Sequence, residues 1–206
     1  ITPVYLVGAG ATPEDEPEVA LVERLLALAL QTVQKFLEAQ MAAGAKAIIL
    51  CEPAANTVFF SPNQLAQSYS VFDRFVMRLN LALRDQLGAR GVDLILHDCG
   101  ELLEGMVSRL GRLDPAMISL GSSRNLWDDA ALLPKTTVLY GNLPTKQFYS
   151  DELMPVQRVR ELAGELTRRI RATGHPFVLG SECDVLSVPG RAETIRRKVE
   201  AFLEIP

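Results

Sequence analysis

The feature that most constrains the fold is a repeated alternation between short, β-branched apolar runs and longer segments with helical periodicity. Such runs are typical of strands that are buried on both faces of a parallel sheet. The predicted strands are Pro3–Gly8, Ala47–Cys51, Val92–His97, Met117–Leu120, Thr136–Tyr140 and Phe177–Leu179. The predicted helices are Val19–Ala43, Asn63–Leu87, Glu101–Leu110, Leu126–Leu132, Asp151–Ala172 and Ala192–Phe202. Successive strand–helix units of this kind predict an α/β protein with a parallel sheet and right-handed crossovers.

Two α/β architectures accommodate six such units: an open doubly wound sheet, or three quarters of a (β/α)₈ TIM-type barrel. The dinucleotide-binding form of the open sheet needs a glycine-rich turn that opens a helix. The segment Gly8-Ala9-Gly10-Ala11-Thr12-Pro13 lacks the third glycine, and no Walker phosphate-binding loop is present. No linker or low-complexity segment divides the chain, so we predict one domain over residues 1–206.

The composition argues against several classes of partner. A net charge of −4, with no dense basic stretch, disfavours nucleic acid. The long apolar segment Val19–Ala43 is interrupted by charged and amide side chains, so it predicts an amphipathic helix and not a membrane span. Three cysteines fit a reducing compartment better than a disulfide framework. Because no secretory signal is visible either, we expect a cytoplasmic protein that binds neither nucleic acid nor membranes.

A His-x-Cys pair at the end of the third predicted strand, with another cysteine just beyond the sixth, is the strongest chemical signal. The carboxyl ends of parallel strands meet at one rim, and a two-residue step returns His97 and Cys99 to the same side of the backbone. With Cys183 they form a Cys₂His set that prefers zinc and leaves a fourth position open, as in catalytic zinc sites. Simple burial of the cysteines is the alternative. We favour burial for Cys51, which ends an apolar run.

Two more polar residues end strands on the same rim. Glu52, followed by Pro53, is predicted to be a fourth, displaceable zinc ligand or to hold a substrate cation or proton. The alternative is that it caps a loop amide. Asn142, after the fifth predicted strand, is a candidate for hydrogen bonding to a ligand or cofactor, with a plain turn asparagine as the alternative.

Several segments together resemble the uroporphyrinogen decarboxylase-like superfamily. They follow the family order over nearly the whole chain: Ala43-Gly44-Ala45, Glu52-Pro53, Ser61-Pro62, Leu96-His97-Asp98-Cys99-Gly100, Tyr140-Gly141-Asn142-Leu143 and Leu179–Val185. The resemblance is greater to its corrinoid-dependent zinc methyltransferases, of the methylcobalamin:coenzyme M type, than to the metal-free decarboxylases. The decarboxylases carry Asp where Glu52 stands and a Gly-His-Gly segment near Cys183.

This resemblance implies a (β/α)₈ barrel with zinc on His97, Cys99 and Cys183. Cobalamin-independent methionine synthase is a second relative, but Gly121 stands at the place of its glutamate ligand, which leaves Glu52 as the candidate. The implied activity is transfer of a methyl group from methylcobalamin, or from a corrinoid protein, to a small thiol. Two alternatives stay open: a metal-free decarboxylase of porphyrinogen acetate side chains, and a non-catalytic barrel fragment that binds a corrinoid or a partner subunit.

The resemblance also implies that the first two βα units of the barrel are missing at the N-terminus, so that this chain would be the C-terminal three quarters of a full barrel. We expect that the chain is a fragment or a natural truncation, or that a partner, such as another copy in a homo-oligomer, fills the gap.

Overall fold

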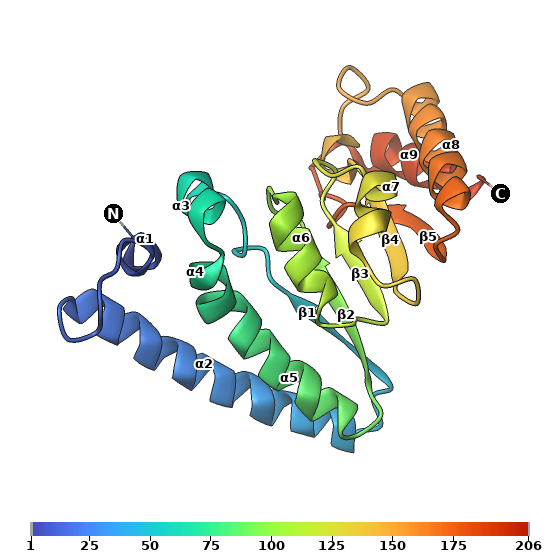
Figure 1. Ribbon diagram of the computed structural model, residues 1–206. Coiled ribbons are helices and arrows are strands. Elements are labelled where there is room, and N and C mark those ends of the chain that lie inside the picture. Colours follow the sequence, from blue (N-terminus) through green and yellow to red (C-terminus); the bar gives the residue numbers. More distant parts are fainter. Residues whose placement is uncertain (1, 206) are drawn as a thin grey trace.

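The computed structural model describes residues 2–205, which contain one parallel sheet with the strand order β1-β2-β3-β4-β5 (Figure 1). The strands are β1 (Ala47–Cys51), β2 (Asp93–Asp98), β3 (Met117–Leu120), β4 (Val138–Leu143) and β5 (Phe177–Ser181). Each strand lies beside the next one in the sequence, without the reversal of strand order that a doubly wound sheet contains. The fold is therefore of the (β/α) barrel type, and β1 and β5 are the edge strands of the part described.

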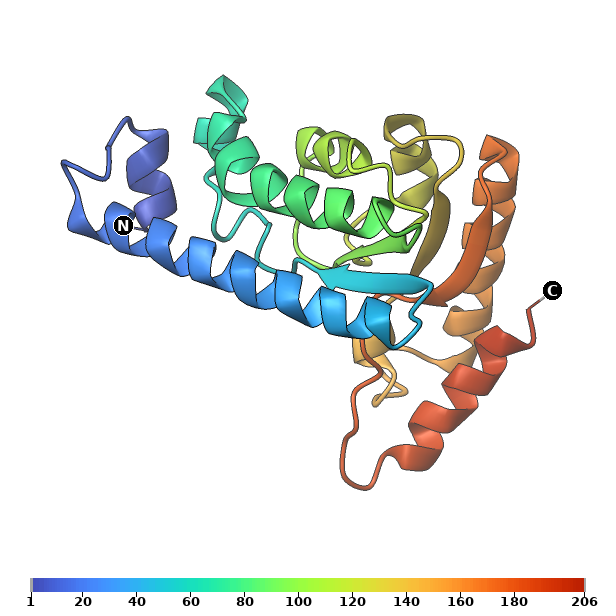
Figure 2. The same cartoon turned by 90° about the horizontal axis from the view of Figure 1, so that it is seen from below.

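The helices precede and follow these strands, and α5, α6, α7 and α8 follow one another around one side of the sheet (Figures 1 and 2). The α-helices are α1 (Pro3–Gly8), α2 (Pro17–Ala42), α3 (Pro62–Gln67), α4 (Ser70–Phe72), α5 (Arg78–Gly88), α6 (Glu104–Gly111), α7 (Leu126–Asp129), α8 (Val156–Thr173) and α9 (Ala192–Leu203). A π-helical segment, η1 (Asp73–Met77), and two short 3₁₀ segments, η2 (Ala130–Leu132) and η3 (Thr145–Gln147), complete the set. Within residues 2–205, no helix has the length and apolar character needed to cross a membrane.

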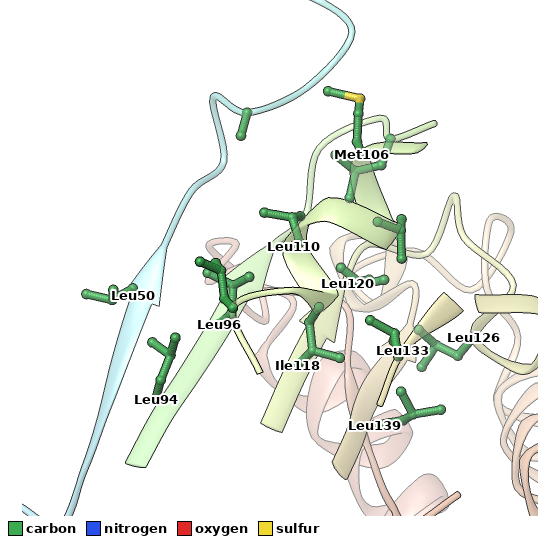
Figure 3. Close-up of a cluster of buried hydrophobic side chains, with 14 of the residues drawn as sticks. Leu50, Leu94, Leu96, Met106, Leu110, Ile118, Leu120, Leu126, Leu133 and Leu139 are labelled. Atoms are coloured by element: carbon green, nitrogen blue, oxygen red, sulfur yellow. The ribbon is translucent and has the colours of Figure 1, made fainter. Parts of the chain in front are cut away.

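The main core lies between the sheet and the helices that cover its outer face. Alternate strand residues point outward, and several of them, including Leu96 and Ile118, have no exposed surface. Figure 3 shows these side chains facing Met106 and Leu110 of α6. Burial of alternate branched residues against amphipathic helices explains why these runs form strands at these positions.

The opposite, inner face of the sheet is exposed along the edge strands β1 and β5, so the prediction that the strands are buried on both faces is wrong for these strands. In β1 exposed and buried residues alternate strictly, and Ile49 is 59 % exposed. On β5, Val178 is 44 % exposed. The inner face is the one that would line the interior of a barrel.

The prediction of a strand at Pro3–Gly8 is also wrong, because this segment is helix α1 and only five strands are present in residues 2–205. Thr2 caps the helix, its Oγ1 accepting a hydrogen bond of 3.2 Å from the Tyr5 backbone, and Pro3 occupies the first turn. Gln64 of α3 donates to the Tyr5 carbonyl oxygen at 2.8 Å, which fixes α1 beside α3. A short apolar run has no periodicity that separates strand from helix.

The segment predicted as one helix over Asn63–Leu87 is interrupted after α3. Ser68 adopts an extended conformation, and the chain turns so that Tyr69 packs on α6. There the Tyr69 ring lies against Gly105, where any Cβ would come within 2.3 Å of it, and under the Arg109 guanidinium at 4.0 Å. The predicted strands Ala47–Cys51 and Met117–Leu120 are observed with these bounds, and the remaining predicted helices and strands are observed with shifted ends.

Candidate metal centre

The ends of β2 and β5 bring His97, Cys99 and Cys183 together. His97 lies in β2, Cys99 follows that strand directly, and Cys183 follows β5. One potential ligand atom from each side chain lies within 4.8 Å of the other two, and all three residues are half-buried. This is a compact set of one imidazole and two thiols, the donor types that zinc prefers. Within residues 2–205 it is the one such group of His, Cys, Asp and Glu side chains.

A serine on the neighbouring strand orients the histidine. Ser119 of β3 is the register partner of His97, and its Oγ lies 2.9 Å from His97 Nδ1. A metal-binding imidazole commonly makes such a second contact, which leaves Nε2 directed at the ion. Burial lowers the pKa of His97, opposed by the charge of Asp184 and assisted by that of Lys146. The ring is therefore neutral at pH 7, the form that binds a metal.

The Cys99 thiol is in an environment that favours its protonated form while no cation is bound. Burial raises the pKa of Cys99, and so do a hydrogen bond and the charge of Cys183. Two thiolates at this distance repel each other, and a divalent cation between them removes that repulsion. The donor set, its spacing and the orientation of His97 therefore fit a zinc ion.

Close contacts between loops hold the cysteine backbones in place. A Cβ at Gly121 would come within 2.8 Å of the Cys99 carbonyl oxygen, so only glycine permits the end of β3 to approach that closely. Beside Cys183, the buried Glu182 accepts hydrogen bonds from the backbone and the hydroxyl of Ser122, at 3.2 and 2.5 Å. The loops after β3 and β5 are thereby joined on both sides of the candidate centre.

Glu52 is not part of the group, contrary to the prediction that its carboxylate is a zinc ligand. It follows Cys51, whose side chain lines the inner face, and the alternation of side chains directs Glu52 to the other side. There it accepts a hydrogen bond of 2.8 Å from Asn80 of α5. Burial raises the pKa of the Glu52 carboxyl, while the Asn80 contact lowers it.

Asn142 is buried in β4 and ties two loop segments together. Its Nδ2 donates to the carbonyl oxygens of Gly121 and Arg124, each at 2.8 Å. Both amide hydrogens are thus used within the protein. This arrangement corresponds to a positioning role near the β3 loop, where Gly121 approaches Cys99.

Four residues of the site were not predicted from the sequence: Cys51, Ser119, Tyr140 and Asp184. They line a cavity of about 400 Å³ on the inner face, together with His97, Cys183, Ser181 and the apolar Ile49, Ile95 and Met117. The prediction that Cys51 belongs to the core is wrong, since this side chain is exposed in the cavity. Strand alternation relative to His97 is the signal that could have identified Ser119, but it requires knowledge of the register between strands.

Comparison with known proteins gives the family. The family model described as uroporphyrinogen decarboxylase (URO-D) matches residues 16–204. A search of individually curated proteins gave no match. The matched segment includes all five strands, the helices from α2 to α9 and the three residues of the candidate metal centre. Its members are enzymes built on TIM-type barrels, in agreement with the strand order described above. The chain therefore belongs to the uroporphyrinogen decarboxylase family.

Proposed function

We propose that the protein transfers a methyl group from a methyl-corrinoid to a small thiol, with zinc held by His97, Cys99 and Cys183. The observation that carries the proposal is the convergence of these three ligand atoms within 4.8 Å, from segments far apart in the sequence. A decarboxylase that works without a metal has no need of such a donor set. The resemblance of the sequence to the corrinoid-dependent branch of the superfamily points to the same reaction.

Zinc bound there would lower the pKa of a thiol entering its open position and so supply a thiolate at neutral pH. In the overall reaction the thiol loses its proton, its sulfur gains the methyl group, and the corrinoid is left as Co(I). Ser119 keeps the His97 ring in its metal-binding orientation. The inner-face cavity has Ile49, Ile95 and Met117 on its wall, and it gives the substrate thiol an apolar surface close to His97 and Cys183.

Methylcobalamin, free or carried by a corrinoid protein, is the proposed donor. The corrinoid would approach the rim at the carboxyl ends of the strands, where barrel enzymes carry their active sites. The Cys183 loop, with the exposed residues Asp184, Val185 and Leu186, lies on that rim.

A metal-free carboxy-lyase acting on porphyrinogen acetate groups is the second candidate, favoured by the description of the family model. The two candidates differ in one measurable property, the requirement for zinc.

The test is the zinc content per chain of protein prepared under reducing conditions, for the wild type and Cys183→Ser. Ser187→Ala, an exposed serine in the same loop, is the matched control. We expect about one zinc in the wild type and the control and little in Cys183→Ser, since structural and catalytic zinc sites depend on each ligand. Methylcobalamin with a panel of small thiols then gives the activity, read from the loss of the methyl-cobalt absorbance. A folded wild type that takes up no zinc would contradict the proposal and favour the carboxy-lyase.

A further inference from the structure

A row of side chains runs across the inner face of the sheet at the level of the candidate metal centre. Cys51 of β1, His97 of β2, Ser119 of β3 and Tyr140 of β4 are successive register partners. Paired residues in a parallel sheet point to the same face, and adjacent strands are about 4.8 Å apart. All four line the same cavity. His97 therefore has Ser119 on one side and the Cys51 thiol on the other.

Cys51 is exposed in this cavity, next to two of the three candidate ligands. It lines the cavity together with His97 and Cys183, although its sulfur lies outside the 4.8 Å group. Because Cys51 is the last residue of β1 and its side chain is not packed in the core, rotation about its Cα–Cβ bond is free to move the sulfur toward the ion.

We propose that Cys51 is the fourth, exchangeable zinc ligand of this site, replaced by the thiol substrate when it binds. This inference rests on the proposed function. The neighbouring carboxylates fit the position less well: Glu52 is held by Asn80 on the other side of the strand, and Asp98 is fully buried there. Of the three carboxylates, only Asp184 lines the cavity, so it is the competing oxygen ligand. Its carboxylate is a harder donor than the thiolates of the cluster.

The exchange conserves protons. The incoming thiol gives up its proton as its sulfur takes the place of the Cys51 sulfur, and Cys51 leaves as a neutral thiol carrying that proton. No oxidant or further reactant is needed.

The experiment is zinc K-edge X-ray absorption on the zinc-loaded protein, which counts sulfur ligands. We expect three sulfurs and one nitrogen in the wild type, and two sulfurs in Cys51→Ala and Cys51→Ser. Glu52→Gln is the matched control, changing the adjacent residue on the opposite face, and should keep three sulfurs. Addition of 2-mercaptoethanol should leave the count at three in the wild type and raise it from two to three in Cys51→Ala.

Alkylation provides a second measurement that does not depend on spectroscopy. Zinc should slow the modification of Cys51 by iodoacetamide by about tenfold or more, because the ligated sulfur is not free to react. In the presence of 2-mercaptoethanol, with iodoacetamide in excess over all thiols for a short pulse, the modification of Cys51 should be restored. Peptide mass analysis separates Cys51 from Cys99 and Cys183.

Failure of this inference is distinguishable from failure of the proposed function. A wild type that binds zinc through two sulfurs, with an oxygen in the fourth position, overturns the role of Cys51 and leaves the proposed function intact. Equal alkylation of Cys51 with and without zinc overturns it as well. Three sulfurs that do not exchange with 2-mercaptoethanol overturn the exchangeable character and indicate a closed structural site. A folded wild type without zinc overturns both proposals.

Discussion

The two faces of the sheet differ in what their side chains do. On the outer face, Leu96 and Ile118 are fully buried under the helices, and the residues form a continuous apolar core. On the inner face, alternate residues of β1 and β2 are partly or largely exposed, and the row at the level of the candidate metal centre carries Cys51, His97 and the buried Ser119. Because successive side chains of a strand point to opposite faces, the same strands supply core residues on one face and the candidate metal ligands on the other.

The environment of a strand residue therefore depends on which face of the sheet its side chain occupies, and its place in the sequence does not give that face. Adjacent residues, such as His97 and Asp98, have unrelated environments: the first reaches a cavity, and the second has no exposed surface. The same applies to Cys51 and Glu52. Comparing a substitution on the outer face with one on the inner face tests this difference between the two faces directly.

The largest effect should come from the outer face. Leu96→Ala removes a fully buried side chain and should lower the free energy of unfolding by about 3 kcal/mol, within the range for buried leucines. Ile49→Ala, on the exposed inner face, should cost less than about 1 kcal/mol. Urea denaturation of the metal-free proteins measures both. Equal losses would contradict the division of the sheet into a packed and an open face.

The zinc affinity of the candidate metal centre, on the inner face, should rise steeply with pH. Burial and Cys183 raise the pKa of Cys99, so this thiol carries its proton in the metal-free protein and must release it on binding. Burial lowers the pKa of His97, which is therefore neutral already above about pH 6.5 and adds no further proton. Because the Cys99 thiol releases its proton on binding, the apparent Kd should fall by at least about tenfold per pH unit between pH 6.5 and 8.

Competition with a chromophoric chelator at several pH values measures this slope. A slope near zero would show that the thiols are not the ligands.

Asp98 should be a source of instability at alkaline pH. Burial raises its pKa to about 7, with the Gly100 N–H lowering it and Glu52 raising it, and Oδ2 has no hydrogen-bond partner. Because the folded pKa is above the ordinary value, ionisation between about pH 4 and 7 disfavours the folded state. Above pH 7 the full penalty applies. Asp98→Asn should therefore be more stable than the wild type by about 1 to 2 kcal/mol at pH 8.

The advantage of Asp98→Asn should shrink as the pH falls toward 4. Urea denaturation of both metal-free proteins across this range is the measurement. A difference that does not change with pH would mean that the carboxyl group does not titrate in this range.

The smallest effect concerns the orientation of the histidine. Ser119→Ala removes the hydroxyl 2.9 Å from His97 Nδ1 and should weaken zinc binding by about tenfold, without a comparable loss of stability. Ser181→Ala, on β5 and lining the same cavity, is the matched control. Direct titration gives the Kd values. Equal affinity in the Ser119 variant and the control would show that the serine does not orient the ligand.

Local sequence pattern was sufficient to predict the α/β class and the five observed strands to within three residues of their ends, because apolar runs and glycine caps report local structure. The barrel type was implied by the resemblance to the family, since the pattern of strands and helices also allowed an open sheet. The sequence also identified His97, Cys99 and Cys183 as one group, since a two-residue step and the common rim of parallel strands bring them together without knowledge of packing. The zinc that we propose there stays a prediction.

The tertiary structure alone decided which neighbours share a face with these residues. Pro3–Gly8 forms a helix instead of the expected strand, and this helix is stabilised by the Thr2 cap and by the hydrogen bond from Gln64 of α3. The tertiary structure also exposed Cys51 in the cavity and directed Glu52 to Asn80, since the strand register and the helices on one side determine where each side chain finds space. Register is a property of pairs of strands, and no single segment contains it.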